Sequence, residues 1–426
     1  MGLKAYKGTI VHTPKLGAYE ILEDGYIVVE NDKVVGTYET LPGEYKNVAV
    51  KDYTGKMIIP GFVDLHFHAP QFSNRGLGLD KELLPWLETY TFPEEAKYKN
   101  LDYARAAYGK VVHELWRQGT TRAVLFGTIH RKATKALMEM LDDAGLGAMV
   151  GKVNMDRNSP PTYCEETKDS IEETKKFIEQ TKDKYKLVKP IITPRFVPTC
   201  TPELMKALGK MAVEYGVPVQ SHLDENRGEI GWVESLHPES DNYSTVYEEH
   251  GLFGKDVPTV MAHCIWNKPE EIKLMSERKM WVAHCPHSNT NLSSGIAPIR
   301  TYLENGVKVG LASDISGGHD VSIPRTIAAA AQSAKLRWVY LNDKEEILST
   351  PEWLYLATKG GGEFFGKVGS FEPGYDFDAL IIDDSSIADV NPRTVQERIE
   401  RYIYVGDDRN IEARYVAGKF VPEPKF

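Results

Sequence analysis

Histidine and carboxylate side chains stand near the ends of several apolar segments in this chain of 426 residues. His66 and His68 are two positions apart in the segment MIIPGFVDLHFH. On a β-strand both side chains point to the same face, so their imidazoles can converge on one metal ion. The alternative is a pair of buried histidines satisfied by hydrogen bonds. Asp64, two residues earlier on that face, could offer an acceptor that orients an imidazole, or it could simply lie at the floor of a barrel.

Two more candidate ligands lie near the ends of later segments, His222 in VPVQSHLDE and Asp314 in KVGLASD. Together with the first two histidines they would form a set of three imidazoles and one carboxylate, which suits catalytic Zn²⁺ and also Fe²⁺. A metal held in this way lowers the pKa of its water to about 7. Asp314 could also accept that water's proton, or it could instead be the N-cap of a helix.

Glu225 and His263 add acid–base chemistry to this set. Glu225 follows His222 by three residues, so its carboxylate could pass a proton to a leaving amine, as a glutamate that is not a ligand does in zinc deaminases. The alternative is a glutamate in the first turn of a helix, where the helix dipole favours it. His263 ends the segment TVMAH and could hydrogen-bond the activated water or, alternatively, be a satisfied core histidine.

The segments that position these residues alternate between apolar and helix-like stretches. Eight apolar segments are candidate strands: MIIPGFVDLHFH, TTRAVLFG, LGAMVGKVNMD, LVKPIITPRFVP, VPVQSHLDE, TVMAHCI, KMWVAHCP and KVGLASD. Amphipathic segments such as LDYARAAYGKVVHELWRQG separate them. This pattern predicts an α/β fold with a TIM-like (β/α)8 barrel, in which the candidate ligands lie at the C-terminal ends of the strands. A doubly wound open sheet is the alternative, but it more often has fewer strands.

Both ends of the chain are rich in short β-segments. We therefore predict a small β-sandwich domain formed from residues 1–58 and 375–426, with the barrel at residues 59–374. The pairs Asp-Gly at 24–25 and Asn-Asp at 31–32 predict hairpin turns.

Composition narrows the class of protein. The net charge is −10 and no long Lys/Arg cluster is present, which argues against nucleic-acid binding. Four cysteines without CxxC spacing favour a reducing compartment. The start of the chain has no apolar run typical of a signal peptide, and no stretch has the length of apolar sequence that a membrane helix needs. These features predict a cytoplasmic protein without a nucleic-acid or membrane partner.

Longer motifs resemble a known family. PGFVDLHFH resembles the first-strand signature of the amidohydrolase superfamily, which implies a metal-bearing barrel and a small β-sandwich. Several segments resemble the guanine deaminases more narrowly: HAPQFSNRG, LLPWLETYTFPEEA, TPRFVPTC, QSHLDENRGEI, HCPHSNTNLSSG, ASDISGG and GGGEFFGKVGSFEPGYDFDALIID. The resemblance runs from about residue 55 to the end of the chain.

This resemblance implies hydrolysis of guanine to xanthine and ammonia by a homodimer with one Zn²⁺ per subunit, or Fe²⁺ in its place. Carried over by position, it implies His66, His68, His222 and Asp314 as metal ligands, Glu225 as proton shuttle, and Gln71, Arg195, Phe196, His222 and His263 as contacts to the purine. Arginine donors suit a carbonyl oxygen, and a glutamine can both donate and accept. Without the resemblance, a salt bridge and a core aromatic would explain Arg195 and Phe196 equally well.

Other functions remain open on the sequence. HCIW after the sixth strand, His287 and the ASD at 312–314 depart from the usual family pattern, although none of these departures removes a proposed ligand. A related enzyme could deaminate or dechlorinate a pterin, a triazine or another purine-like ring. A catalytically silent barrel used as an assembly module is a further alternative, but the intact ligand set argues against it.

Overall fold

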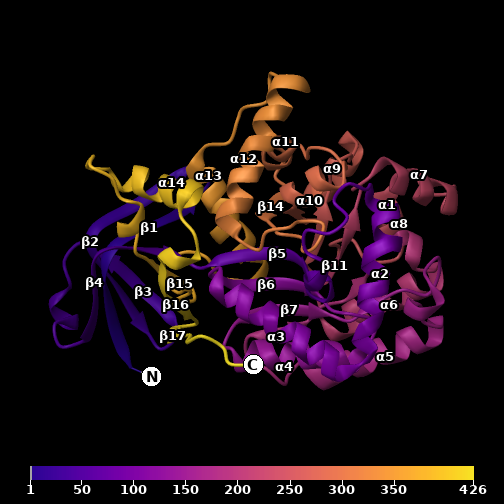
Figure 1. The fold of residues 1–426 in the computed structure, drawn as a ribbon, viewed down its shortest axis with the longest axis horizontal. Helices are drawn as coiled ribbons and strands as arrows, with labels where there is room; N and C mark the ends of the chain where they lie inside the picture. Colours follow the sequence, from indigo (N-terminus) through magenta and orange to yellow (C-terminus); the bar gives the residue numbers. More distant parts are fainter. Residues whose placement is uncertain (1) are drawn as a thin grey trace.

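The central part of the chain alternates strands with helices and forms a mixed α/β fold (Figure 1). The computed structural model of the protein describes residues 2–426. Parallel strands form the interior, and the longer helices lie around them. The main helices are α1 (Leu83–Trp86), α2 (Phe92–Ala96), α3 (Leu101–Arg117), α4 (Arg131–Asp143), α5 (Thr167–Thr181), α6 (Pro202–Tyr215), α7 (Arg227–Leu236), α8 (Tyr243–Glu249), α9 (Pro269–Glu277), α10 (Pro286–Asn291), α11 (Ile299–Glu304), α12 (Ile323–Tyr340), α13 (Thr350–Tyr355) and α14 (Val395–Val405). Among the described residues, no helix is both long enough and apolar enough to cross a bilayer.

Helix α6 shows how local sequence sets an element. The Thr201 side chain accepts a hydrogen bond from the backbone N–H of Leu204, and Pro202 occupies the first turn, where its missing N–H costs nothing. Gly216 ends the helix with φ of 60°, a left-handed conformation that glycine adopts without strain. The face of α6 that includes Leu204 and Leu208 is buried against the core, so the helix covers the strands beneath it.

The parallel strands pair in two four-stranded sheets and one two-stranded sheet. The first four-stranded sheet contains β5 (Phe62–His68), β6 (Thr120–Phe126), β7 (Gly147–Gly151) and β9 (Val188–Pro190). The second contains β11 (Val219–Leu223), β12 (Thr259–His263), β13 (Trp281–His284) and β14 (Lys308–Leu311). The two-stranded sheet pairs β8 (Val153–Asn154) with β10 (Thr193–Pro194). The pairing therefore differs from the single closed barrel predicted from the sequence. The predicted fourth strand is divided between β9 and β10, which end at Pro190 and Pro194, and proline has no N–H for a ladder hydrogen bond.

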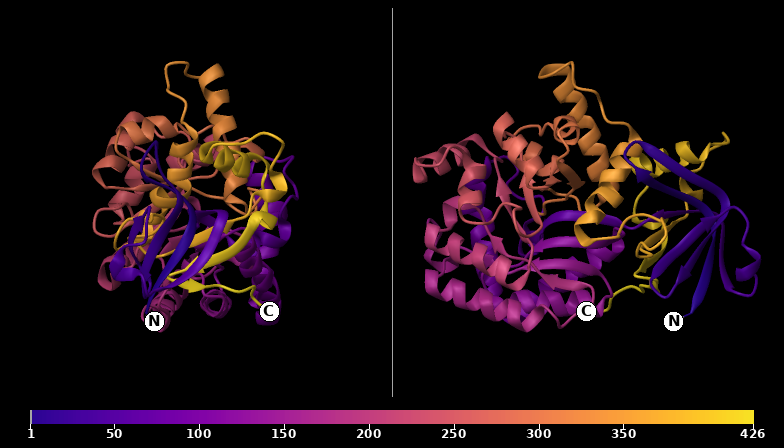
Figure 2. Two further views of the ribbon diagram at one scale, coloured as in Figure 1. Left: turned by 90° about the vertical axis from the view of Figure 1, so that its left-hand side faces the viewer. Right: turned by 180° about the vertical axis from the view of Figure 1, so that it is seen from behind.

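A seven-stranded sheet combines strands from both ends of the chain (Figure 2). Its order is β17 (Lys419–Phe420), β16 (Ile411–Val416), β15 (Ala379–Ile382), β4 (Ala49–Pro60), β1 (Leu3–Lys15), β2 (Ala18–Glu30) and β3 (Lys33–Tyr38). The boundary predicted at residue 58 falls inside β4, which continues to Pro60 before β5 begins at Phe62. Because only Gly61 separates the two strands, one continuous segment links this sheet to the parallel strands.

Two turn predictions had different outcomes. The turn at Asn31 is confirmed, with φ of 58° at the junction of β2 and β3. The hairpin at Asp24–Gly25 is wrong, because β2 runs through both residues. Gly25 lies opposite Gly8 at a shift in register between β1 and β2, and a Cβ on Gly25 would approach the Leu22 Cβ to 2.8 Å. Gly25 therefore allows the close approach of the chain at a β-bulge or similar irregularity between β1 and β2.

A buried ion pair joins the parallel strands to the terminal sheet. Arg122 on β6 donates from Nε to Asp378 Oδ2 at 2.6 Å and from Nη2 to Asp376 Oδ2 at 3.0 Å. Asp378 also accepts from the backbone N–H of Ala417 at 2.7 Å. The Arg122 and Asp378 side chains are 4% and 0% exposed, so each charge depends on the other for compensation.

We expect Arg122→Ala to lower the free energy of unfolding by about 3–5 kcal/mol, because it leaves the Asp378 carboxylate buried without its cation. Urea unfolding measures this loss. The control is Arg105→Ala, which removes an exposed pair with Glu139 and should cost less than about 1 kcal/mol. Equal losses in the two variants would contradict the role of Arg122.

Candidate active site

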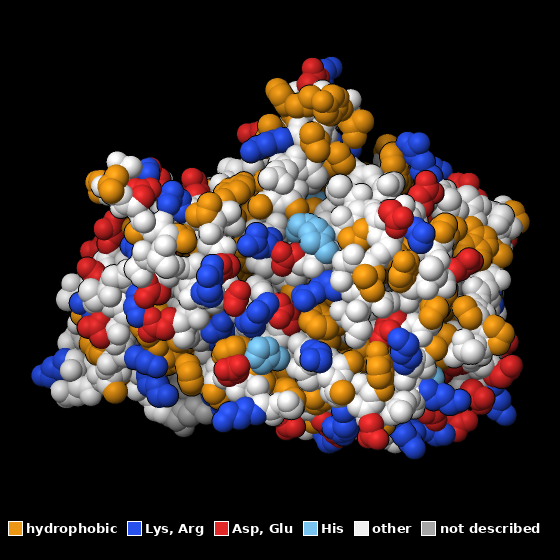
Figure 3. All heavy atoms as spheres, in the orientation of Figure 1, with side chains coloured by type: hydrophobic (Ala, Val, Ile, Leu, Met, Phe, Trp, Pro, Cys, Tyr) orange, Lys and Arg blue, Asp and Glu red, His pale blue; other side chains and the backbone are white. Residues whose placement is uncertain are grey.

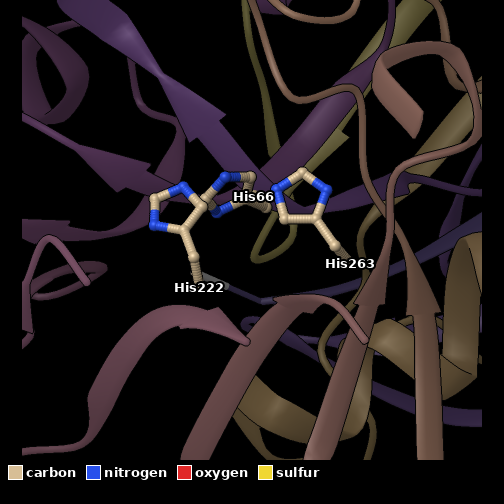
Figure 4. Close-up of side chains that lie close together, drawn as sticks. All are labelled: His66, His222 and His263. Carbon is tan, nitrogen blue, oxygen red and sulfur yellow. The ribbon is translucent and has the colours of Figure 1, made fainter. Parts of the chain in front are cut away.

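The C-terminal ends of the parallel strands bring the predicted ligands together. His66 and His68 lie on β5, His222 lies on β11, His263 ends β12, and Asp314 follows β14. All five residues are buried. Figure 4 shows His66, His222 and His263 facing one another at the ends of their strands. These side chains therefore lie together because each stands at or near the C-terminal end of a parallel strand, as predicted.

The ligand atoms of the four predicted metal ligands lie close to one another. Nε2 of His68 is 3.0 Å from Nε2 of His222, and Oδ1 of Asp314 is 3.2 Å from Nε2 of His66 and 3.6 Å from Nε2 of His68. Nδ1 of His222 donates to the carbonyl oxygen of Arg195 at 2.6 Å. That hydrogen bond fixes the proton on Nδ1 and leaves the lone pair of Nε2 directed at the other ligands.

The protonation states and unpaired atoms of this cluster fit a divalent metal ion. Burial, followed by the neighbouring His66, holds the pKa of His68 and of His222 well below the ordinary value, so both imidazoles are neutral, as metal ligands must be. Among the described residues, Nε2 of His66, which faces the other ligand atoms, is buried without a hydrogen-bond partner, which is uncommon in folded proteins. Burial alone would raise the pKa of Asp314. His66 and then His263 outweigh this effect and hold the pKa well below its ordinary value, so the carboxylate stays charged.

Two overlapping triads hold ligand atoms within 4.8 Å of one another, His66–His68–Asp314 and His66–His222–His263. A third triad joins His263 and Asp314 to Cys285. Burial raises the pKa of the Cys285 thiol well above its usual range, and its Sγ donates to the carbonyl oxygen of Ala283 at 3.3 Å. A protonated thiol is a poor ligand, which argues against Cys285 as a ligand of the metal.

His263 and Glu225 face the ligands from the opposite side. Nδ1 of His263 donates to Oδ1 of Asn289 at 2.9 Å, and its Nε2 lies 3.4 Å from Oε2 of Glu225 and 3.7 Å from Oδ2 of Asp314. Ser294 Oγ donates to Oε1 of Glu225 at 3.4 Å. Burial, with a smaller contribution from Asp314, raises the pKa of Glu225 well above its ordinary value. Glu225 can therefore hold a proton near neutral pH.

The structure also decides between several local alternatives. Glu225 precedes Asn226, the N-cap of α7, so it is not a first-turn glutamate. Asp314 does not cap a helix, since the next helix along the chain, α12, is capped by Ser322. Asp314 and His263 adopt φ of 48° and 70°, a left-handed conformation that costs about 1–3 kcal/mol and is concentrated at functional sites.

Asp64 differs from its prediction. Its carboxylate accepts from the backbone N–H groups of His66 at 3.2 Å and Ser313 at 3.1 Å, and from the Ser313 hydroxyl, rather than from an imidazole. Burial raises the pKa of Asp64 to about 6. Asp64 therefore ties β5 to the segment that carries Asp314.

A cavity opens above the ligands. It is lined by His68, Gln71, Leu83, Trp86, Leu87, Arg195, Phe196, His222, Glu225, Glu229, His263, Leu292, Asp314 and Gly317. Eight of the nine predicted site residues line it, and the exception is His66. Apolar walls with a few converging polar groups are typical of small-molecule sites.

Sequence reasoning missed the residues that complete this cavity and support it. Glu229 lines it, yet its carboxylate also accepts from the backbone N–H groups of Glu225 and Asn226 at 3.1 and 3.2 Å, as expected of a residue at the start of a helix. Glu95 binds the Arg195 guanidinium at 2.8 Å, and Asn289 binds His263. Glu95 and Asn289 stand inside the segments LLPWLETYTFPEEA and HCPHSNTNLSSG, but neither has a local pattern that marks its partner.

Comparison with known proteins identifies the family of this chain. Residues 57–421 match the Amidohydrolase family. A guanine deaminase from Dictyostelium discoideum is 41% identical, with 98% of this chain and 97% of that protein covered, and the guanine deaminase of Escherichia coli K12 is 34% identical over 99% and 98%. The crystal structure of a guanine deaminase from C. acetobutylicum with guanine bound in the active site is 50% identical, with a TM-score of 0.97 over 99% of this chain and 100% of that one. This chain belongs to the amidohydrolase family.

Proposed function

We propose that the protein is a guanine deaminase, which hydrolyses guanine to xanthine and ammonia. The observation that supports this most directly is the likeness to the C. acetobutylicum enzyme, whose structure holds guanine, across 99% of this chain. The cavity here has the polar and apolar side chains that such a ring needs.

We propose His66, His68, His222 and Asp314 as the ligands of one Zn²⁺ per subunit, with Fe²⁺ as the alternative. The bound ion would supply a water molecule whose pKa is lowered to about 7. Side chains of the protein would carry out the proton transfers. Glu225 would donate the proton of its carboxyl group to a ring nitrogen, and Asp314 Oδ2 would accept the proton released by the attacking water as the C–O bond forms. That proton would pass to the amino group, so that the C–N bond breaks and ammonia leaves. His263 would hydrogen-bond the attacking water.

The opposite end of the cavity would hold the purine. Arg195 offers fixed donors to a carbonyl oxygen of the base, and Gln71 offers both a donor and an acceptor to ring nitrogens. The Phe196 ring closes the apolar wall, with its centroid 6.5 Å from that of His222. His222 and His263 complete the contacts that we propose for the substrate.

We infer that the two four-stranded sheets are halves of one (β/α)8 barrel. Backbone hydrogen bonds from Asp314 to His66 at 2.9 Å and from His68 to Ile315 at 3.0 Å link the segment after β14 to β5. An isolated bridge between Ile192 and Val219 links the other edges. We further propose residues 59–374 as the catalytic domain, and residues 1–58 and 375–426 as a β-sandwich domain that carries the seven-stranded sheet except for the last two residues of β4.

We also propose that the protein acts in purine catabolism, because guanine is the proposed substrate. We propose a cytoplasmic location because the four cysteines are unpaired. A homodimer is supported by the end of α12, which projects from the molecule and carries apolar side chains (Figure 3). Leu336, Trp338, Val339 and Tyr340 are 52%, 41%, 56% and 78% exposed, and such patches mark contact surfaces. Sedimentation velocity separates dimer from monomer and tests this assembly.

The test of the proposed function is incubation with guanine, with and without a chelator. We expect xanthine and ammonia in equal amounts, and loss of both after the metal is removed, because unactivated water is a poor nucleophile. Purified protein that holds metal but releases no ammonia from guanine would contradict the proposal.

A substrate panel addresses the alternatives at the same time. A related deaminase or chlorohydrolase would act on a pterin, a triazine or another purine-like ring in preference to guanine. A silent assembly module would release ammonia or chloride from none of them and would bind metal weakly. The apolar walls of the cavity and the raised pKa of Glu225 favour an active enzyme over that module.

A further inference from the structure

Glu95 on α2 lies directly behind the part of the cavity that we assign to the purine. Its oxygens accept from Nη1 of Arg195 at 3.0 and 2.8 Å, and Oε1 also accepts from Nε2 of Gln71 at 2.9 Å. The Glu95 side chain is 0% exposed and is not part of the cavity lining. One buried carboxylate therefore contacts both polar side chains that would hold the base.

The contacts of Gln71 allow only one orientation of its amide. Oε1 of Gln71 accepts from the backbone N–H of Ser316 at 3.1 Å, while Nε2 donates to Glu95. A carboxylate only accepts and a backbone N–H only donates, so a flipped amide would lose both hydrogen bonds. The amide keeps one N–H and one lone pair for a ligand in the cavity that it lines.

Glu95 also compensates the charge of Arg195. Within the described part of the chain, it is the only carboxylate in a salt bridge with this guanidinium, and the Phe92 ring lies 5.1 Å from Cζ. Because Glu95 uses only Nη1, the donors on Nε and Nη2 remain for a carbonyl oxygen. The pair is neutral overall, so it presents donors without a net charge.

We propose that Glu95 is a positioning residue that makes the site select a neutral purine over an anionic one. It fixes the donor and acceptor of Gln71, aims Arg195, and cancels the positive charge that would otherwise attract an anion. This inference rests on the proposed function, because it assigns the selectivity of that same site.

The test uses Glu95→Gln, with Glu94→Gln as the matched control. Glu94 is the neighbouring carboxylate on α2 and contacts Lys97 and Tyr103 instead of the site. We expect Glu95→Gln to raise KM for guanine by about 10- to 100-fold, the loss typical of hydrogen bonds to charged groups, with metal content and kcat changed far less. Glu94→Gln should keep the wild-type KM.

A second measurement separates positioning from general damage to the fold. Xanthine loses a proton more readily than guanine. Inhibition of the enzyme by xanthine can therefore be measured with the neutral ring at low pH and with the anion at high pH. In Glu95→Gln, Arg195 carries an uncompensated charge. We therefore expect the inhibition constant of the variant, divided by that of the wild type, to fall as the pH rises.

An unchanged KM together with a ratio that does not depend on pH would overturn the inference. If Glu95→Gln fails to fold or loses its metal, Glu95→Asp decides the question, because it keeps the charge but withdraws the carboxylate by one methylene group. For Glu95→Asp, a raised KM for guanine with a ratio of inhibition constants that does not depend on pH supports the inference. A wild-type KM in Glu95→Asp overturns the inference. A wild-type enzyme that releases no ammonia from guanine would instead refute the proposed function.

Discussion

Glu225→Gln is expected to lower kcat by about 10²- to 10⁴-fold or more, the range that a positioned acid or base contributes, while the metal content stays at the wild-type level. The amide has nearly the same shape as the carboxyl group but cannot hold and release a proton. The geometry supports this role, since Oε2 of Glu225 lies 3.4 Å from Nε2 of His263 beside the ligand cluster. Steady-state kinetics and metal analysis of the same preparation measure both quantities.

Glu234→Gln is the matched control for that variant. Glu234 lies on α7, and its side chain is 58% exposed at 3.9 Å from Lys268, so its replacement should leave kcat unchanged. Turnover by Glu225→Gln close to that of Glu234→Gln would show that another group moves the proton.

His66→Ala should abolish both metal binding and turnover. His66 belongs to both of the histidine-rich triads, so its removal takes a nitrogen from each of them. Without the ion, the pKa of the nucleophilic water returns from about 7 to about 15.7, which lowers the hydroxide available at neutral pH by roughly eight orders of magnitude. Metal content after gel filtration and ammonia release from guanine report the two losses separately.

His113→Ala controls for the loss of a histidine as such. His113 lies on α3 with 37% of its side chain exposed and pairs with Glu423, far along the chain from the ligands. This variant should keep its metal and its rate. Full metal occupancy in His66→Ala would mean that the ion is held by a different set of residues.

Much of the site could be predicted from the sequence because its chemistry is tied to strand ends. The alternation of apolar segments with amphipathic helices placed His66, His222 and His263 where parallel strands end, and such ends meet at one edge. The limits of the strands were less predictable. The segment expected as the first barrel strand is divided at Gly61, and the fourth is divided between Pro190 and Thr193. Periodicity along the chain does not mark such local breaks.

The sequence by itself determined which side chains could bind a metal and move protons, since residue type and spacing along a strand set those capacities. Only the tertiary structure showed that Glu95 meets Arg195, one hundred residues away along the chain, and that Asp64 binds backbone groups instead of an imidazole. The physical reason is that a hydrogen bond needs its donor and acceptor within about 3 Å. Residues distant in sequence reach that distance only when the packing of many other elements fixes where each backbone lies.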